Sequence, residues 1–98
     1  MKYNQHTLNK LENILEEANY IVRYERGSFQ SGYCILEDKK VVVLNKFLNI
    51  EGRINTLIDL IPHVSISYDL LTLDAQKLYD ELMLKQVAHL PQRQEDTK

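Results

Sequence analysis

The apolar positions near the N-terminus recur at spacings of three and four residues, and polar or charged residues fill the positions between them. This spacing places the apolar side chains on one side of a helix. The residues of this stripe are Leu8, Leu11, Ile14, Leu15 and Ala18. Asn4 or Thr7 is a suitable N-cap. The pattern predicts an amphipathic helix over residues 4–18 that packs its stripe on another part of the protein.

Three segments that follow are typical of β-strands. Residues 20–25 are rich in aromatic and β-branched side chains, residues 33–36 form a second short apolar run, and residues 41–44 read Val-Val-Val-Leu. A run of four apolar residues favours a strand that is covered on both faces, so the third segment is the best candidate for the middle of the sheet. Because the connections are short, as in the charged turn of residues 37–40, we expect neighbouring strands to pair antiparallel as a meander.

Helical spacing returns in the second half of the chain. Asn49 can cap a helix over about residues 51–61, which Pro62 should end. Residues 63–71 alternate in places between apolar and polar and predict a short extended piece. Thr72 begins a last helix, and its inward stripe is expected to hold Ala75, Leu78, Leu82 and Ala88.

Length and composition fit this outline. A chain of 98 residues with 44% hydrophobic and 27% charged residues is the size and type of one folded domain. The fold class predicted is α+β, with an N-terminal helix, a three-stranded antiparallel meander and two C-terminal helices within residues 1–90. Residues 91–98 hold no apolar side chain except a proline, so we expect a mobile tail.

Charge and cysteine content narrow the classes of function. The formal net charge is −2, so the molecule as a whole has no basic field for a polyphosphate, and we do not expect it to bind nucleic acid. A single cysteine, Cys34, cannot form an internal disulfide, and no leader or membrane-spanning run is visible in the sequence. These features predict a cytoplasmic protein without membrane association. Cys34 has no histidine close to it in the sequence and is expected to be a structural thiol.

One part of the chain resembles a known family. The valine-rich strand is followed by a helix containing Thr56, Leu57 and His63, in the order and spacing of the Thr-Leu-x-His-Glu-x-x-His pattern of the ImmA/IrrE-like zincin peptidases. The similarity covers residues 40–63, and the chain also resembles short bacterial proteins of uncharacterised families. The family's first histidine position is Asp59 here, and its glutamate position is Leu60.

These departures change the chemistry that the resemblance implies. Asp59 and His63 keep an i, i+4 spacing that would let both ligate a metal from one helical face. Leu60 cannot act as the general base that activates a zinc-bound water, and no third ligand is evident. A degenerate zincin-like metal-binding or hydrolase-like domain is therefore an alternative function, and an ordinary helix-end histidine is the simpler interpretation.

A second alternative is an anion or nucleotide sensor. Arg23, Arg26 and Ser28 surround Gly27, and donors on a glycine turn can hold a phosphate or carboxylate. The segment matches neither a GxxxxGK[ST] nor a GxGxxG phosphate motif. A solvated loop with salt bridges is the simpler interpretation.

The leading hypothesis is a small non-catalytic interaction or accessory domain that needs no cofactor and acts as a homodimer or with a protein partner. No complete acid and base pair, ligand set or phosphate cradle can be assembled from the sequence. Exposure of a valine-rich strand to water is unfavourable, and a two-fold contact between two copies of the chain is the commonest way to cover such a surface. The residues expected at this interface are Val41, Val43, Tyr24 and Tyr33.

Overall fold

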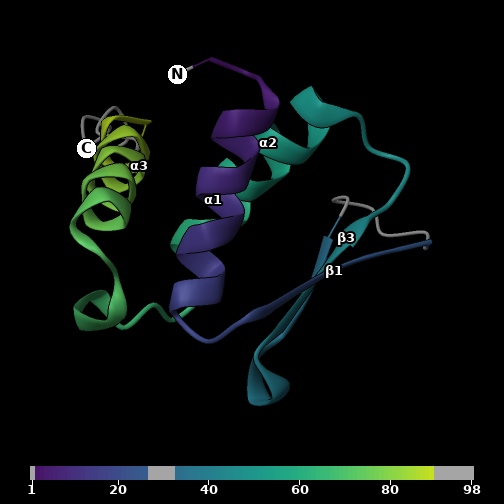
Figure 1. The fold of residues 1–98 in the computed structure, drawn as a ribbon, viewed down its shortest axis with the longest axis horizontal. Coiled ribbons are helices and arrows are strands. Elements are labelled where there is room, and N and C mark those ends of the chain that lie inside the picture. The colour runs from purple at the N-terminus through teal and green to yellow at the C-terminus, as the bar shows by residue number, and fades with distance from the viewer. Residues whose placement is uncertain (1, 27–32, 90–98) are drawn as a thin grey trace, which may run out of the picture.

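The computed structural model describes residues 2–26 and 33–89, without the side chains of residues 37 and 85–89. Its helices are α1 (Gln5–Glu17), α2 (Ile50–Leu60) and α3 (Leu73–His89), and its strands are β1 (Ile21–Glu25), β2 (Tyr33–Leu36) and β3 (Val41–Asn45). Three single turns of 3-10 helix are η1 (Glu37–Lys39), η2 (Ile61–His63) and η3 (Tyr68–Leu70). Three helices and a three-stranded sheet confirm an α+β fold (Figure 1).

The sheet is mixed, and the predicted antiparallel meander is wrong. The strand order is β1-β3-β2, with β1 parallel to β3 and β2 antiparallel to β3. The chain turns tightly through η1 between β2 and β3, which makes these two strands antiparallel neighbours. The seven residues between β1 and β2 are enough to reach past the end of β3 to the far edge of the sheet. β3 is therefore inserted between strands that precede it in the chain.

Burial explains why β3 takes the middle. All four residues of the run Val41–Leu44 are buried, with exposed fractions between 0% and 8%. An edge strand would leave one row of backbone donors and acceptors unpaired, whereas β3 pairs along both sides. The prediction that this valine-rich strand is central is confirmed.

All three helices lie on one side of the sheet (Figure 1). Paired residues of a sheet share a face, so the register places one set of strand side chains toward the helices. This inner set is Val22, Tyr24, Tyr33, Ile35, Val42 and Leu44, and each packs in or against the hydrophobic core. The core is completed by the predicted stripe of α1, which is buried throughout, and by Ile54, Leu57 and Leu60 of α2.

The ends of α1 and α2 follow from local side-chain chemistry. Asn4, one of the two predicted caps, accepts a hydrogen bond from the Thr7 backbone N–H at 2.9 Å. At the other end of α1, Asn19 has φ 70°, a left-handed conformation that asparagine tolerates, and the Tyr20 N–H donates to the Leu15 carbonyl at 2.9 Å. α2 begins at Asn49, as predicted, and its side chain accepts from the Gly52 N–H at 2.7 Å.

The connection from α2 to α3 differs from the extended piece predicted for residues 63–71. α2 ends before Pro62, but the chain continues through η2 and then forms η3. Val64 and Leu71 are buried in the core while η3 is exposed, so this segment is anchored at two points and turns between them. The alternation of apolar and polar residues in this segment reflects the separate burial of Val64 and Leu71, and the segment does not form a strand.

α3 is joined to α1 by a buried contact and by a polar one. Leu82 and Ala75 of α3 are buried. The Glu17 carboxylate at the end of α1 accepts from the Thr72 backbone N–H at 2.8 Å and from its hydroxyl at 3.3 Å. The predicted tail, residues 91–98, and the side chain of Ala88 lie outside the described residues.

Candidate functional site

The outer face of the sheet is the side turned away from the helices. Its residues are Ile21, Arg23 and Glu25 of β1, Val41, Val43 and Asn45 of β3, and Cys34 and Leu36 of β2. The register aligns Ile21, Val41 and Leu36 in one apolar row across the sheet and Arg23, Val43 and Cys34 in the next. Of the helices in the described part of the chain, none covers this face (Figure 1).

Most of the accessible surface on the outer face belongs to the flanking strands. Val41 and Val43 are only 7% and 8% exposed because their neighbours on both sides shield them. Ile21 is 56% exposed and Leu36 is 41% exposed. Arg23 forms an ion pair with Glu25 along β1. The face therefore presents two exposed apolar side chains and one pair of opposite charges.

The four residues predicted at an interface divide between the two sides of the sheet. Val41 and Val43 lie on the outer face. Tyr24 and Tyr33 point to the helices and pack against the core. The exposed residues Ile21 and Leu36 did not enter the sequence-based set, although the alternation of side chains along each strand would have placed them with the valines once the register was known.

The predicted anion-binding residues are also separated. Arg23 is engaged with Glu25 on the outer face. Arg26 follows β1, and its guanidinium carbon lies 5.8 Å from the centroid of the Phe47 ring. Ser28 lies outside the described residues. The use of these residues together at one anion site stays a prediction.

Asp59 and His63, the predicted metal ligands, are both exposed. Asp59 is in the last turn of α2, whereas His63 is in η2, where the 3-10 turn containing Pro62 replaces the regular helical spacing. Among the side chains that the structure describes, no group of three or more from histidine, cysteine, aspartate and glutamate is placed to share a metal ion. Their role as ligands stays a prediction.

A polar cluster that the sequence did not reveal joins α1, α2 and β1. The Tyr24 hydroxyl of β1 donates a hydrogen bond to the Glu12 carboxylate of α1. The Arg53 guanidinium of α2 lies 4.3 Å from the centroid of the Tyr24 ring. Arg53 also donates to two carbonyl groups of the loop after β3, from Nε to Leu48 at 3.0 Å and from an Nη to Lys46 at 3.1 Å. The cluster fixes both helices and the loop to the sheet.

The Tyr24 hydroxyl has a pKa above its ordinary value of about 10. Burial raises the pKa most, and the hydrogen bond to Glu12 and its negative charge raise it further, while Arg53 acts in the opposite direction. In the folded protein Tyr24 therefore keeps its proton at a pH where the tyrosine of an unfolded chain loses it. Tyr24 contributes a stability that is complete below about pH 10 and is lost as the pH rises through the raised pKa.

Replacing Tyr24 by phenylalanine should make the protein less sensitive to alkali. Near neutral pH we expect Tyr24→Phe to lower the free energy of unfolding by about 1 kcal/mol through loss of the hydrogen bond. This difference from the wild type should shrink as the pH rises above about 10, because only the wild type carries the Tyr24 proton. Urea unfolding at several pH values measures it, with Tyr3→Phe as the control at an exposed ring. A constant difference across this range would contradict the assignment.

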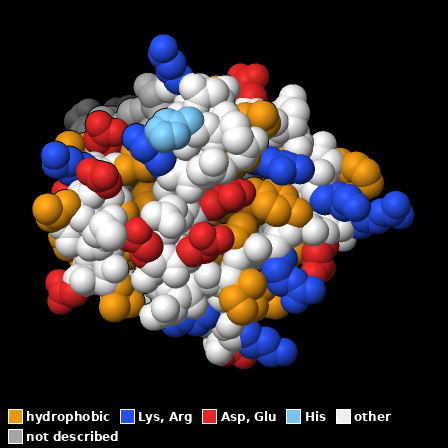
Figure 2. Space-filling model, in the orientation of Figure 1, with side chains coloured by type: hydrophobic (Ala, Val, Ile, Leu, Met, Phe, Trp, Pro, Cys, Tyr) orange, Lys and Arg blue, Asp and Glu red, His pale blue; other side chains and the backbone are white. Residues whose placement is uncertain are grey.

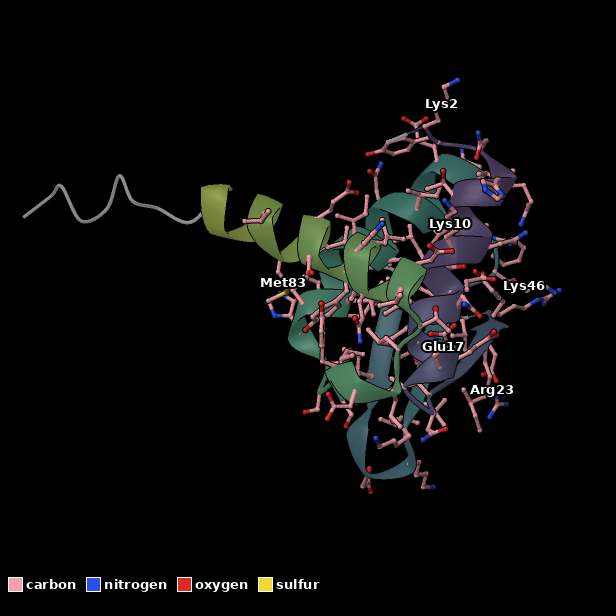
Figure 3. All side chains as sticks on the ribbon, turned by 60° about the vertical axis from the view of Figure 1, so that its left-hand side comes forward. Lys2, Lys10, Glu17, Arg23, Lys46 and Met83 are labelled. Carbon is pink, nitrogen blue, oxygen red and sulfur yellow. The ribbon has the colours of Figure 1, made fainter. Side chains whose placement is uncertain are left out.

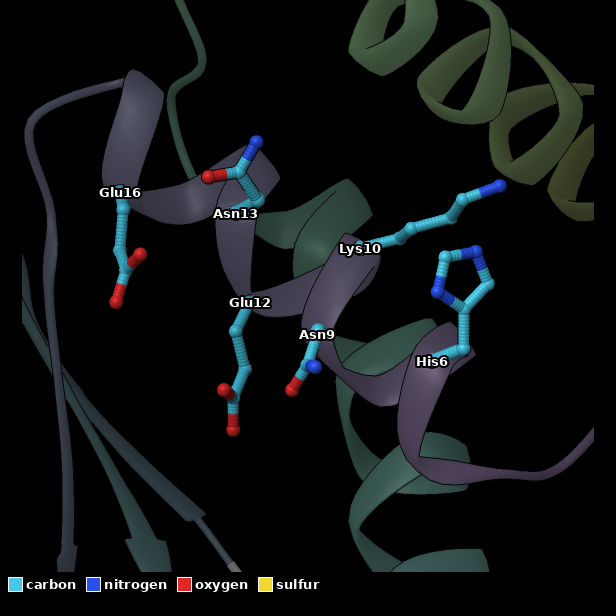
Figure 4. Close-up of a pocket in the computed structure, with 6 residues that line it drawn as sticks. All are labelled: His6, Asn9, Lys10, Glu12, Asn13 and Glu16. Carbon is cyan, nitrogen blue, oxygen red and sulfur yellow. The ribbon is translucent and has the colours of Figure 1, made fainter.

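A shallow depression runs along the exposed side of α1. It encloses about 390 Å³ and is lined by His6, Asn9, Lys10, Glu12, Asn13 and Glu16, all from this helix (Figure 4). A smaller hollow of about 210 Å³ lies between α1 and α3, where Lys10 and Asn13 face Thr72, Asp74 and Leu78. Both are lined mainly by exposed polar side chains of mixed charge. Such a lining does not hold a nucleophile or general base in a protected position.

Comparisons with protein-family models, with curated proteins and with solved structures gave no match for this chain. The resemblance of residues 40–63 to the ImmA/IrrE-like peptidases stays a prediction. Over the described residues, none of the helices has the length and apolar character that crossing a bilayer requires.

Proposed function

We propose that this protein is a small non-catalytic interaction domain that associates with a second copy of itself through the outer face of the sheet. The observation that carries the proposal is the one-sided arrangement of the helices, which leaves Ile21 and Leu36 exposed in a row with the buried Val41. Exposed apolar residues that lie together on a sheet face mark an interaction surface more often than scattered ones do. The thiol of Cys34 on the same face is compatible with a reducing compartment such as the cytoplasm.

The charges on the outer face favour a second copy as the occupant. Arg23 and Glu25 are two residues apart on β1 and point to the same side. A two-fold axis that lies between the two facing sheets and runs across the strands, level with Tyr24, brings the Arg23 of one copy toward the Glu25 of the other, and the reverse. The pair Arg23 and Glu25 is thus complementary in charge to the same pair of a second copy.

The size of the face sets the strength of the association. Strands about 4.8 Å apart with a rise of about 3.3 Å per residue give a face of roughly 14 × 17 Å, or about 240 Å² per copy. A stable interface buries about 800 Å² per partner. We therefore expect a weak dimer that forms at concentrations of roughly 0.1 to 1 mM and exchanges with the monomer.

Sedimentation equilibrium over a range from about 10 μM to 1 mM tests the proposal. The average mass of the wild type should rise toward that of a dimer at the upper end. The double variant Ile21→Glu, Leu36→Glu places two like charges in the apolar row and should stay monomeric, since unpaired charges in a contact cost several kcal/mol. Both positions are exposed in the single chain, so we expect the fold to tolerate the change.

Leu73→Glu is the matched control, because Leu73 is an exposed leucine on α3, away from the sheet. This variant should associate like the wild type. A wild-type chain that is monomeric at every concentration would refute the proposal. A double variant that associates as strongly as the wild type would show that another surface is used.

The two alternatives from the sequence have weaker support. A metal site at Asp59 and His63 needs at least a third ligand, and the glutamate position of the zincin pattern is Leu60. An anion sensor built on Arg23 must first break the ion pair with Glu25. The geometry favours self-association over both.

A further inference from the structure

A group of basic side chains gathers where the parallel strands β1 and β3 end. Arg26 directly follows β1 and Lys46 directly follows β3. The Lys46 backbone N–H donates to the Glu25 carbonyl at 3.0 Å, which holds the two strand ends together. Arg53 reaches the same place from α2 through its hydrogen bonds to the carbonyls of Lys46 and Leu48. We call Arg26, Lys46, Arg53 and the intervening Phe47 the basic edge.

Among the described side chains, the cations of the basic edge lack acidic partners. Within residues 2–26 and 33–89, Arg26, Lys46 and Arg53 form no ion pair with a carboxylate. Two acidic groups of the neighbouring elements are engaged elsewhere, since Glu25 pairs with Arg23 and Glu12 accepts the Tyr24 hydroxyl, while Glu51 lies exposed in the first turn of α2. A chain of net charge −2 thus presents a local concentration of positive charge. In Figure 2 the Lys and Arg side chains gather on the right of the molecule, with hydrophobic side chains among them.

The arginines of the basic edge are also oriented for binding. Arg26 and Arg53 lie over the faces of Phe47 and Tyr24. A guanidinium stacked on a ring keeps the donors along its edge for a planar anion such as a carboxylate or a phosphate. Arg53 uses two of the five donors of a guanidinium in the bonds to the loop.

Phe47 adds an apolar contact. Phe47 is 70% exposed, which is a large exposed fraction for an aromatic residue. The backbone N–H of Phe47 donates to the Asn45 side chain at 3.0 Å, which fixes the start of the loop and holds the ring beside Arg26. An exposed aromatic ring among cations fits a ligand that carries an apolar group next to its negative charges.

We propose that the basic edge binds an acidic segment of a partner protein, in which carboxylates or phosphates flank an apolar side chain that packs on Phe47. A continuous polyphosphate fits less well, because the basic edge offers three cations beside an exposed aromatic ring, and a chain of net charge −2 repels a strand that extends beyond them. The inference rests on the proposed role as an interaction domain but uses a surface separate from the apolar row of the outer face. Figure 3 shows Lys46 on the side of the molecule opposite Met83 of α3, so α3 leaves this edge accessible.

Fluorescence anisotropy with a labelled peptide Glu-Glu-Phe-Glu-Glu tests the inference at low ionic strength. The 98-residue chain should bind this peptide and not the charge-reversed Lys-Lys-Phe-Lys-Lys. The variant Arg26→Glu, Lys46→Glu should bind at least about tenfold more weakly, as expected for reversal of two contacting charges. Lys77→Glu, on the exposed side of α3, is the matched control and should bind like the wild type. Phe47→Ala should lower the affinity for the peptide. The dependence of this affinity on salt concentration should stay as in the wild type, since the substitution removes no charge.

The double variant Ile21→Glu, Leu36→Glu separates this inference from self-association. It should bind the acidic peptide like the wild type, and binding by a chain that never dimerises would leave the inference intact. Failure of the wild type to bind the peptide overturns the inference, as does binding that Arg26→Glu, Lys46→Glu leaves unchanged. Tighter binding of a single-stranded oligonucleotide of equal charge would overturn the choice of a protein partner.

Discussion

Replacing Leu44 by alanine is expected to lower the free energy of unfolding by about 3 kcal/mol, within the range of about 2 to 5 kcal/mol for large apolar residues in cores. Leu44 is fully buried on the central strand, and its neighbours in register are Tyr24 on β1 and Tyr33 on β2. The substitution removes apolar contacts and leaves a cavity between the sheet and the helices. Closely packed neighbours on both sides limit how far the structure can collapse into it.

Urea unfolding of the wild type and the variant measures this loss. Leu84→Ala is the control, because Leu84 is 68% exposed on α3 and its truncation should change the stability by no more than about 0.5 kcal/mol. Equal losses for the two variants would contradict the placement of β3 in the middle of the sheet. The contrast therefore tests the central strand without reference to function.

Replacing Arg53 by alanine should lower the free energy of unfolding by about 2 kcal/mol. The change removes two hydrogen bonds from a charged donor to backbone carbonyls, at 3.0 and 3.1 Å, and the stacking on Tyr24. Hydrogen bonds to charged groups contribute roughly 1.5 to 3 kcal/mol, but part of this site is open to water and the carbonyls can be hydrated after the change. Arg53→Lys keeps the charge without the planar fork and should recover only part of the loss.

Arg23→Ala is the matched control for the loss of an arginine. Arg23 forms a surface ion pair with Glu25, and such pairs contribute about 0 to 1 kcal/mol. Unfolding is measured at low micromolar concentration, where the chain is monomeric in our account. If Arg23→Ala proves as harmful as Arg53→Ala, then the cluster of Tyr24, Glu12 and Arg53 does not hold the helices to the sheet.

Helical elements could be predicted well from the sequence because their signals are local. The stripe from Leu8 to Ala18 repeats with the helical period, and every member is buried in the structure. Asn4 and Asn49 begin their helices as expected, since an N-cap acts on backbone groups only two or three residues away. Asn19 was a missed signal, because an asparagine after the last apolar residue is typical of a left-handed helix end.

Sheet topology was predicted only in part, and two expectations for β3 were incompatible. In a three-stranded meander the second strand lies in the middle, whereas burial of Val41–Leu44 requires the third strand to lie there. The burial of apolar side chains determines the strand order, because a valine-rich strand at the edge of the sheet would lose apolar contacts along its whole length. The alternative order costs little, since a connection of seven residues spans the sheet with a small loss of chain entropy. In this sheet the burial of Val41–Leu44 fixes the strand order, and neighbouring strands do not follow chain order.

The candidate surfaces could not be predicted from the sequence because they depend on register and on distant contacts. Ile21 and Leu36 are fifteen positions apart in the sequence and share a row only through Val41. Arg53 reaches Tyr24 from another helix, and no spacing rule connects these two residues. The parallel pairing of β1 and β3, which was not foreseen, is what brings Arg26 and Lys46 to one edge.

The most direct test of self-association through the outer face is a dilution series of ¹H–¹⁵N correlation spectra from about 10 μM to about 1 mM. This measurement needs no substitution and reports on each backbone amide. We predict that the shifts that change with concentration belong to the residues of the outer face, led by Ile21, Val43 and Leu36. Spectra that do not change, or changes confined to α1 and α3, would contradict the account.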